Sequence, residues 1–136
     1  MTTPRQALDR LRTAADSGAL DALCQRFEVR LVTVFGSAVH DAAHADDLDL
    51  GVMFEPDADG DIVGLTSALI ELTGTDALDV MDAQRASPTA RARAIVEALA
   101  LYESEAGAYA QAQMGAAVLE WDTQWMRRMA LDSLAR

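Results

Sequence analysis

The fold of this chain is decided by two apolar runs, Leu31-Val32-Thr33-Val34-Phe35-Gly36-Ser37 and Asp47-Leu48-Asp49-Leu50-Gly51-Val52-Met53-Phe54. The first run is short and rich in β-branched residues, which predicts a buried strand that ends at Gly36. Glycine lets a backbone approach a ligand closely, and Ser37 is suited to cap a helix whose free N–H groups favour an anion such as phosphate. The second run predicts another strand, from Leu48 to Phe54.

Two carboxylates at the start of the second run form a candidate metal site. Side chains alternate along a strand, so Asp47 and Asp49 are expected to project from one face while Leu48 and Leu50 project from the other. Mg²⁺ prefers oxygen ligands and is usually held by one or two carboxylates together with substrate phosphates. An Asp pair beside an anion-binding turn therefore predicts a site for Mg²⁺ and a phosphorylated substrate.

A third carboxylate is expected from Leu78-Asp79-Val80-Met81-Asp82, a short apolar segment that follows turn residues. This segment predicts a third strand with an aspartate in its middle, where a polar side chain is not the default. We expect Asp79 to complete the site. Asp82 is expected to point to the opposite face of the strand and to face water.

Another acidic segment, Asp57-Ala58-Asp59-Gly60-Asp61, has the alternating carboxylates of a calcium loop. It lacks glycine at the sixth loop position and an acid at the twelfth, where Ala68 stands. The segment therefore predicts a turn, with Asp61 as the cap of a helix from Ile62 to Leu72.

Further helices are expected on both sides of these strands. Pro4 predicts the start of a helix that runs to about Ser17, and a second, shorter helix is expected from Leu20 to Phe27. Ser87 and Pro88 form a strong helix-start signal, and the composition remains helical from Arg91 to Leu99.

The segment from about Ala106 to Leu134 predicts one long helix or a broken pair bent at Gly115. Apolar residues recur along it at helical spacing and include both tryptophans of the chain. Core packing is the usual explanation of such a stripe. Contact with a partner or with a second copy is the alternative, since tryptophan and methionine are enriched at interfaces. The stripe consists of Met114, Val118, Trp121, Trp125 and Met129.

Length and composition favour one α/β domain of 136 residues, with 51% hydrophobic but only 5% aromatic residues. The net charge of −11 argues against general binding to nucleic acids or to anionic membranes, which requires a basic patch. The N-terminal residues do not resemble a signal peptide and no apolar run approaches about 20 residues, so we expect a cytoplasmic protein. The single cysteine, Cys24, is expected to be a small core residue.

Three of these segments together resemble the signature of the minimal nucleotidyltransferases (MNT), small members of the polymerase-β-like nucleotidyltransferase superfamily. They are Val34-Phe35-Gly36-Ser37, Asp46-Asp47-Leu48-Asp49-Leu50 and Leu78-Asp79-Val80. Downstream, residues 85–93 and 101–103 resemble the helix and the final strand that close these domains. The likeness covers roughly residues 28 to 136 and is greatest to the antitoxins of HEPN/MNT toxin–antitoxin pairs.

The resemblance implies a small polymerase-β-like palm fold, with a short mixed sheet flanked by helices and a long C-terminal helical segment. Its expected parts are N-terminal helices over about residues 1–27, a catalytic core over 28–104 and a C-terminal helix over 105–136. By the same resemblance, Gly36 and Ser37 hold the triphosphate of ATP, Asp47 and Asp49 bind two Mg²⁺ ions, and Asp79 completes the site and helps to activate the attacking hydroxyl.

The implied reaction is transfer of AMP from ATP to a tyrosine of a HEPN ribonuclease, which silences this toxin. Two other functions stay open: an inactive antitoxin of the same fold that acts by binding alone, and a small-molecule adenylyltransferase, whose relatives carry an additional substrate domain. The C-terminal helix is expected to contribute to any hetero-oligomer.

The chain departs from the family pattern after the glycine-serine pair. The family commonly carries Ala-Arg-Gly where this chain has Val39-His40-Asp41, so the arginine is missing. Because the chain contains no lysine, a protein cation on the phosphates must be an arginine. Arg85, Arg91 and Arg93 are the nearest candidates in sequence; the alternative is that they form a solvated helix face.

Overall fold

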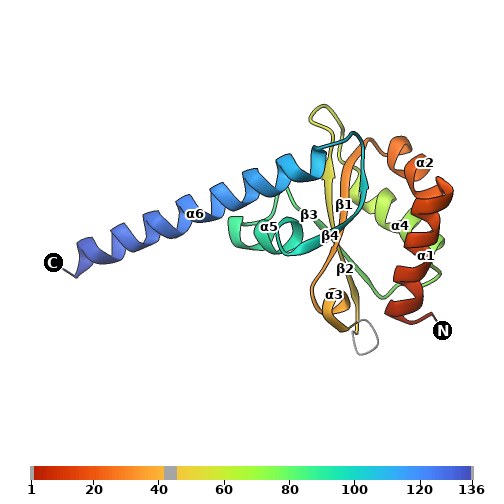
Figure 1. Cartoon of the computed structure of the whole chain (residues 1–136), viewed down its shortest axis with the longest axis horizontal. Helices are drawn as coiled ribbons and strands as arrows, with labels where there is room; N and C mark the ends of the chain where they lie inside the picture. The colour runs from red at the N-terminus through yellow and green to blue at the C-terminus, as the bar shows by residue number, and fades with distance from the viewer. Residues whose placement is uncertain (1, 42–45, 136) are drawn as a thin grey trace.

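The computed structural model describes residues 2–41 and 46–135, and for His40 and Asp41 the backbone alone. Helices and strands alternate along most of the chain (Figure 1). The helices are α1 (Pro4–Ser17), α2 (Ala19–Arg26), α3 (Ser37–Asp41), α4 (Ile62–Thr73), α5 (Pro88–Ile95) and α6 (Ala108–Leu134), and the strands are β1 (Val29–Phe35), β2 (Leu48–Phe54), β3 (Leu78–Asp82) and β4 (Ala98–Glu103).

The strands form one mixed sheet in the order β3-β2-β1-β4. Strand β1 is antiparallel to both β2 and β4, whereas β2 and β3 run parallel. Helices α1, α2 and α4 cover one face, and α5 with the first turns of α6 covers the other (Figure 1). The expected mixed sheet flanked by helices, with a long C-terminal helix, is thus confirmed.

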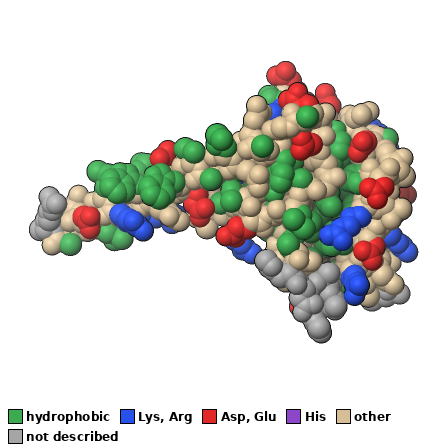
Figure 2. All heavy atoms as spheres, viewed as in Figure 1, with side chains coloured by type: hydrophobic (Ala, Val, Ile, Leu, Met, Phe, Trp, Pro, Cys, Tyr) green, Lys and Arg blue, Asp and Glu red, His purple; other side chains and the backbone are tan. Residues whose placement is uncertain are grey.

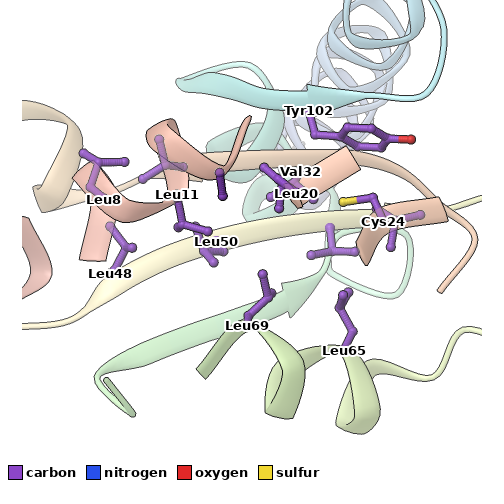
Figure 3. Packing of buried hydrophobic residues seen from close by; sticks show 14 of the residues in the cluster. Leu8, Leu11, Leu20, Cys24, Val32, Leu48, Leu50, Leu65, Leu69 and Tyr102 are labelled. Carbon is purple, nitrogen blue, oxygen red and sulfur yellow. The ribbon is translucent and has the colours of Figure 1, made fainter. Parts of the chain in front are cut away.

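The larger part of the core lies between the sheet and α1, α2 and α4. Leu48 and Leu50 of β2 meet Leu65 and Leu69 of α4 there, and α1 contributes Leu11 (Figure 3). Each of these leucines is fully buried, and burying such a side chain stabilises a fold by about 2 kcal/mol. This face therefore fixes the sheet on which the candidate site is built.

The second face is smaller, and α5 approaches the sheet most closely at Gly51. A Cβ atom at Gly51 would lie 2.6 Å from Oγ1 of Thr33 and 3.1 Å from Cβ of Ala94. The fully buried Thr33 hydroxyl donates a hydrogen bond to the carbonyl of Ala94. Helix α5 is therefore fixed directly against the strand that carries Asp49.

The predicted helix starts are confirmed by their hydrogen bonds. The side chain of Asp61 accepts from the amide of Gly64 at 2.9 Å, so this acidic segment ends in a helix cap. Ser87 likewise accepts from the amide of Ala90 at 3.2 Å, and Pro88 is the first residue of α5. Both caps satisfy amides that the first helical turn leaves without a partner.

One expectation about the C-terminal half is wrong. Helical structure does not continue to Leu99, because α5 ends at Ile95 and Leu99 pairs with Val34 in the sheet. For the last segment, the first of the two alternatives is confirmed: one continuous helix begins at Ala108, and Gly115 does not break it. Pairing with β1 outweighs the helical preference of Ala98 and Leu99, since local propensity is a weak constraint. Within residues 2–41 and 46–135, no helix is both long and apolar enough to cross a membrane.

Cys24 is fully buried in α2, as expected. Burial, with a smaller contribution from the nearby Asp21 carboxylate, raises the pKa of the Cys24 thiol to about 12. Because the thiolate is the reactive form, we expect native protein at pH 8 to react with a thiol reagent at least about 100-fold more slowly than urea-unfolded protein. Rates followed by absorbance test this expectation, and equal rates in the two states would show that α2 does not shield the thiol.

Candidate active site

The pairing of β2 with β3 brings two of the predicted carboxylates together. Asp49 and Asp79 are direct partners in this parallel ladder, and Phe35 is the partner of Asp49 on the other side. Directly paired residues project from the same face, and neighbouring strands lie about 4.8 Å apart. Because Phe35 packs in the α5–α6 core, both carboxylates belong to that face of the sheet.

Gly36 ends β1 beside Asp49. Its φ of 75° lies in the left-handed region, which glycine adopts without strain. A Cβ atom here would overlap Oδ2 of Asp49 and would lie 3.4 Å from its Cγ. Gly36 is therefore required by conformation and by space, and the turn touches the carboxylate as the sequence predicted.

Asp47 and Ser37 lie at the edge of this site. Asp47 is exposed and precedes the first residue of β2, and Ser37 is exposed as the first residue of α3. Ser37 thus follows Gly36 directly at the start of α3. The side chains of His40 and Asp41 lie outside the described residues.

The carboxylates of this site repel one another. Partial burial is the largest cause that raises the pKa of Asp49, and the charges of Asp79 and Asp47 raise it further, while Arg93 lowers it. The negative charges around ionised Asp49 thus favour the binding of a cation. These oxygen donors fit Mg²⁺, which takes carboxylates together with phosphate oxygens.

In the part of the chain that the structure describes, no three His, Cys, Asp or Glu side chains are close enough to form a ready-made metal cluster. Carboxylates without a bound cation are expected to stand apart, because like charges repel. A cation at this site would complete its coordination with substrate oxygens and water, as Mg²⁺ commonly does.

The three candidate arginines have different environments. Arg91 donates from Nε to the carbonyl of Ala83 at 2.8 Å and from Nη2 to the carbonyl of Gln84, so it fixes the β3–α5 connection. Arg85 is exposed and lies 3.6 Å from Asp82. Arg93 is exposed in the last turn of α5, and its charge acts on Asp49.

The expectation that Asp82 faces water is wrong. Its side chain is only 16% exposed; Oδ1 accepts from the amide of Gln84 at 3.2 Å, and Oδ2 lies 3.6 Å from Nε of Arg85. Asp82 therefore shapes the turn after β3. A short local bond of this kind is typical of aspartate in turns.

Comparison of the sequence with models of protein families identifies the family of this chain. The model of the polymerase beta nucleotidyltransferase family matches residues 19–106. This chain belongs to that family. The match extends from α2 through β4 and contains Gly36, Asp49 and Asp79, whereas α6 lies outside it.

Solved structures resemble this nucleotidyltransferase along most of its length. A chain of a toxin–antitoxin complex with AMP-PNP is 17% identical with a TM-score of 0.66, and the match covers 89% of this chain and 99% of the other. A chain of the complex of the tri-AMPylated Shewanella oneidensis HEPN toxin with its MNT antitoxin is 16% identical with a TM-score of 0.63, covering 92% and 99%. A chain of MntA-HepT, 16% identical, has a TM-score of 0.61 and coverage of 89% and 97%.

At these identities the likeness establishes the shared fold. No curated protein matches the sequence of this nucleotidyltransferase.

One residue that supports the candidate site was not predicted. Gly51 lies two positions after Asp49, and its lack of a side chain allows α5 to pack on this strand. A glycine inside a strand pattern is a signal of close approach by another backbone. This signal was present in the sequence, but the element that approaches could be identified only from the fold.

Proposed function

We propose that this nucleotidyltransferase is an antitoxin that transfers AMP from ATP to a tyrosine of a HEPN-family ribonuclease, and thereby neutralises it. The observation that carries the proposal is the pairing of Asp49 with Asp79 beside the Gly36 turn. Two similar folds support the choice of substrate and partner: one solved with AMP-PNP, the other in complex with a tri-AMPylated HEPN toxin.

Each residue of the site has a role in this proposal. Gly36 leaves room for the Asp49 carboxylate beside the turn at which the phosphates would bind, and Ser37 offers its hydroxyl and amide to them. Asp47, Asp49 and Asp79 would hold Mg²⁺, with two ions expected. When bound, Mg²⁺ neutralises negative charge on the phosphate oxygens and on the departing pyrophosphate.

The transfer step forms one bond and breaks another at the α-phosphorus. The tyrosine oxygen of the toxin attacks this phosphorus, the bond to the bridging oxygen of the β-phosphate breaks, and pyrophosphate leaves. Asp79 is exposed and can orient the tyrosine hydroxyl and accept its proton. Asp49 is more enclosed and, by its position beside Gly36, fixes the phosphate end of the reaction.

The intact mass of the toxin tests this proposal. A HEPN-like protein encoded beside this chain is incubated with it, ATP and Mg²⁺, and its mass is measured. We expect the mass to rise in steps of one AMP. An unchanged mass together with a stable complex would instead support the second function, neutralisation by binding alone.

The exposed side chains of α6 suggest that binding of the toxin also contributes to its neutralisation. Trp125 follows Ala116 by nine positions, or about two and a half turns of helix. The two side chains therefore lie on opposite sides of α6. Ala116 is buried against the domain, whereas Trp121 and Trp125 are 67% and 56% exposed. Figure 2 shows hydrophobic side chains gathered along this projecting helix. Core packing is therefore not the explanation of the apolar stripe, and we propose that α6 contacts the toxin.

Replacing both tryptophans tests the contact. We expect Trp121→Ser with Trp125→Ser to lower toxin affinity at least about 100-fold, because buried aromatic anchors dominate binding energies at interfaces. The thermal midpoint of the free protein should change little, since both side chains are exposed. Calorimetric titration with the toxin and a thermal melt give the two readings.

Val63→Ser is the matched control, because Val63 is 74% exposed on α4, away from the stripe. Its toxin affinity should equal that of the wild type. Unfolding of the double tryptophan variant, or toxin binding at wild-type affinity, would contradict an interface role of α6.

A further inference from the structure

Helix α5 carries Arg93 to the face of the sheet on which the carboxylates lie. Ala94, the next residue, packs against Gly51, and Gly51 and Asp49 share one face because they are two positions apart on β2. The backbone of Arg93 is thus anchored beside the strand of Asp49. Its side chain is exposed, so a bound molecule could contact it.

The influence of Arg93 on Asp49 supports this placement. Among the described residues, Arg93 lowers the pKa of the Asp49 carboxyl, against the larger effect of burial and the charges of Asp79 and Asp47. A guanidinium close enough to act on this carboxylate is also placed to act on a phosphate bound beside it.

The other two candidate arginines interact with other parts of the chain. Arg91 donates two hydrogen bonds to backbone carbonyls of residues 83 and 84, and Arg85 lies 3.6 Å from Asp82 at the end of β3. The sequence has Val39-His40-Asp41 where the family commonly carries Ala-Arg-Gly, so histidine replaces the motif's arginine, and the chain has no lysine.

We propose that Arg93 is the phosphate-binding cation of this site and contacts the triphosphate of the nucleotide. The inference rests on the proposed function, since it assumes a nucleoside triphosphate at the carboxylates. A guanidinium presents paired N–H donors that match two phosphate oxygens, so Arg93 would fix the triphosphate as well as neutralise it. A cation supplied by α5 would thus compensate for the arginine that is missing from the turn.

The test measures binding of AMP-PNP with Mg²⁺ by calorimetry, independently of AMP transfer. We expect Arg93→Ala to weaken binding by about 10- to 100-fold, as the loss of a charge-assisted hydrogen-bond pair does. Arg93→Lys should recover part of this loss, because lysine keeps the charge without the paired donors. The affinity of the wild type should also fall more steeply with salt than that of Arg93→Ala, because the lost contact is ionic.

Arg85→Ala is the matched control: it removes the same exposed side chain eight positions earlier and should bind AMP-PNP within about twofold of the wild type. Equal affinities of wild type and Arg93→Ala, an equal loss in Arg85→Ala, or absence of AMP-PNP binding by the wild type would overturn the assignment. AMP-PNP binding that depends on Arg93, without AMP transfer to the toxin, would instead overturn the proposed function and leave the role of Arg93 intact.

Discussion

Replacing Asp47 and Asp49 together by asparagine should lower AMP transfer to the toxin at least about 1,000-fold, which corresponds to about 4 kcal/mol of transition-state stabilisation. An amide retains the shape of the carboxylate but loses the charge that would hold Mg²⁺ and oppose the phosphates. Single-turnover transfer, read by the mass of the toxin, gives the rate. Toxin binding through α6 should persist in this variant.

The same substitution at Asp49 should not weaken the fold. A raised pKa means that the folded state binds the Asp49 proton more tightly than the unfolded chain does. The protonated Asp49 carboxyl therefore stabilises the fold at low pH, and this contribution is lost as the pH rises from the pKa of Asp49 in the unfolded chain through its higher pKa in the folded protein. At pH 7 the ionised Asp49 carboxylate opposes folding. Without metal, Asp49→Asn should unfold at a urea concentration equal to or above that of the wild type.

Asp59→Asn provides the control, since Asp59 is an exposed aspartate in the loop before α4. This variant removes one negative charge outside the site and should transfer AMP at the wild-type rate. Full transfer by the Asp47→Asn, Asp49→Asn variant would contradict the assignment of the site. Loss of transfer with loss of fold would contradict the stated effect on stability.

The largest effect on stability is expected from Gly51→Val, at about 3 kcal/mol of lost unfolding free energy. The new side chain would enter the space between β2 and α5, where a Cβ atom alone already lies 2.6 Å from Oγ1 of Thr33. It would force α5 outward and break the buried hydrogen bond from Thr33 to Ala94. Urea unfolding followed by circular dichroism measures the loss.

Gly115→Ala is the matched control because it also adds a Cβ atom to a glycine. Nothing lies within 4 Å of that atom in α6, so alanine should stabilise the helix by about 0.5–1 kcal/mol. A Gly51→Val variant as stable as the wild type would show that α5 is not fixed on β2 as described.

Local signals predicted most of this fold. The caps at Asp61 and Ser87, the glycine that ends β1 and the alternation in β2 are each specified by a few neighbouring residues, and each is present in the structure. The candidate site residues Gly36 and Asp49 could be selected from the sequence for the same reason, because both stand near the ends of predicted strands. That Asp49 is the direct partner of Asp79 follows from the register between two strands, which neither strand encodes alone.

Features that depend on distant contacts could not be predicted. Leu99 joins a strand because β1 offers an unpaired edge, although its own neighbourhood favours a helix. The separate environments of Arg85, Arg91 and Arg93 depend on how α5 lies against the sheet and the turn that follows β3. An apolar stripe with this spacing can be buried in the core or exposed on the surface. Periodicity therefore could not predict that Trp121 and Trp125 are exposed.

The way in which α6 is anchored has a consequence for the lifetime of the protein. Beyond Ala116 no described side chain of this helix is buried, so its later turns are not stabilised by packing on the domain. Most helical stability in proteins comes from such packing, so these turns should open more often than the rest of the fold. Arg127 and Arg128 are exposed there and offer cleavage sites to trypsin-like proteases. A partner that covers the helix would close these sites, so copies without a partner should be degraded first and the amount of partner should set how much of this protein persists.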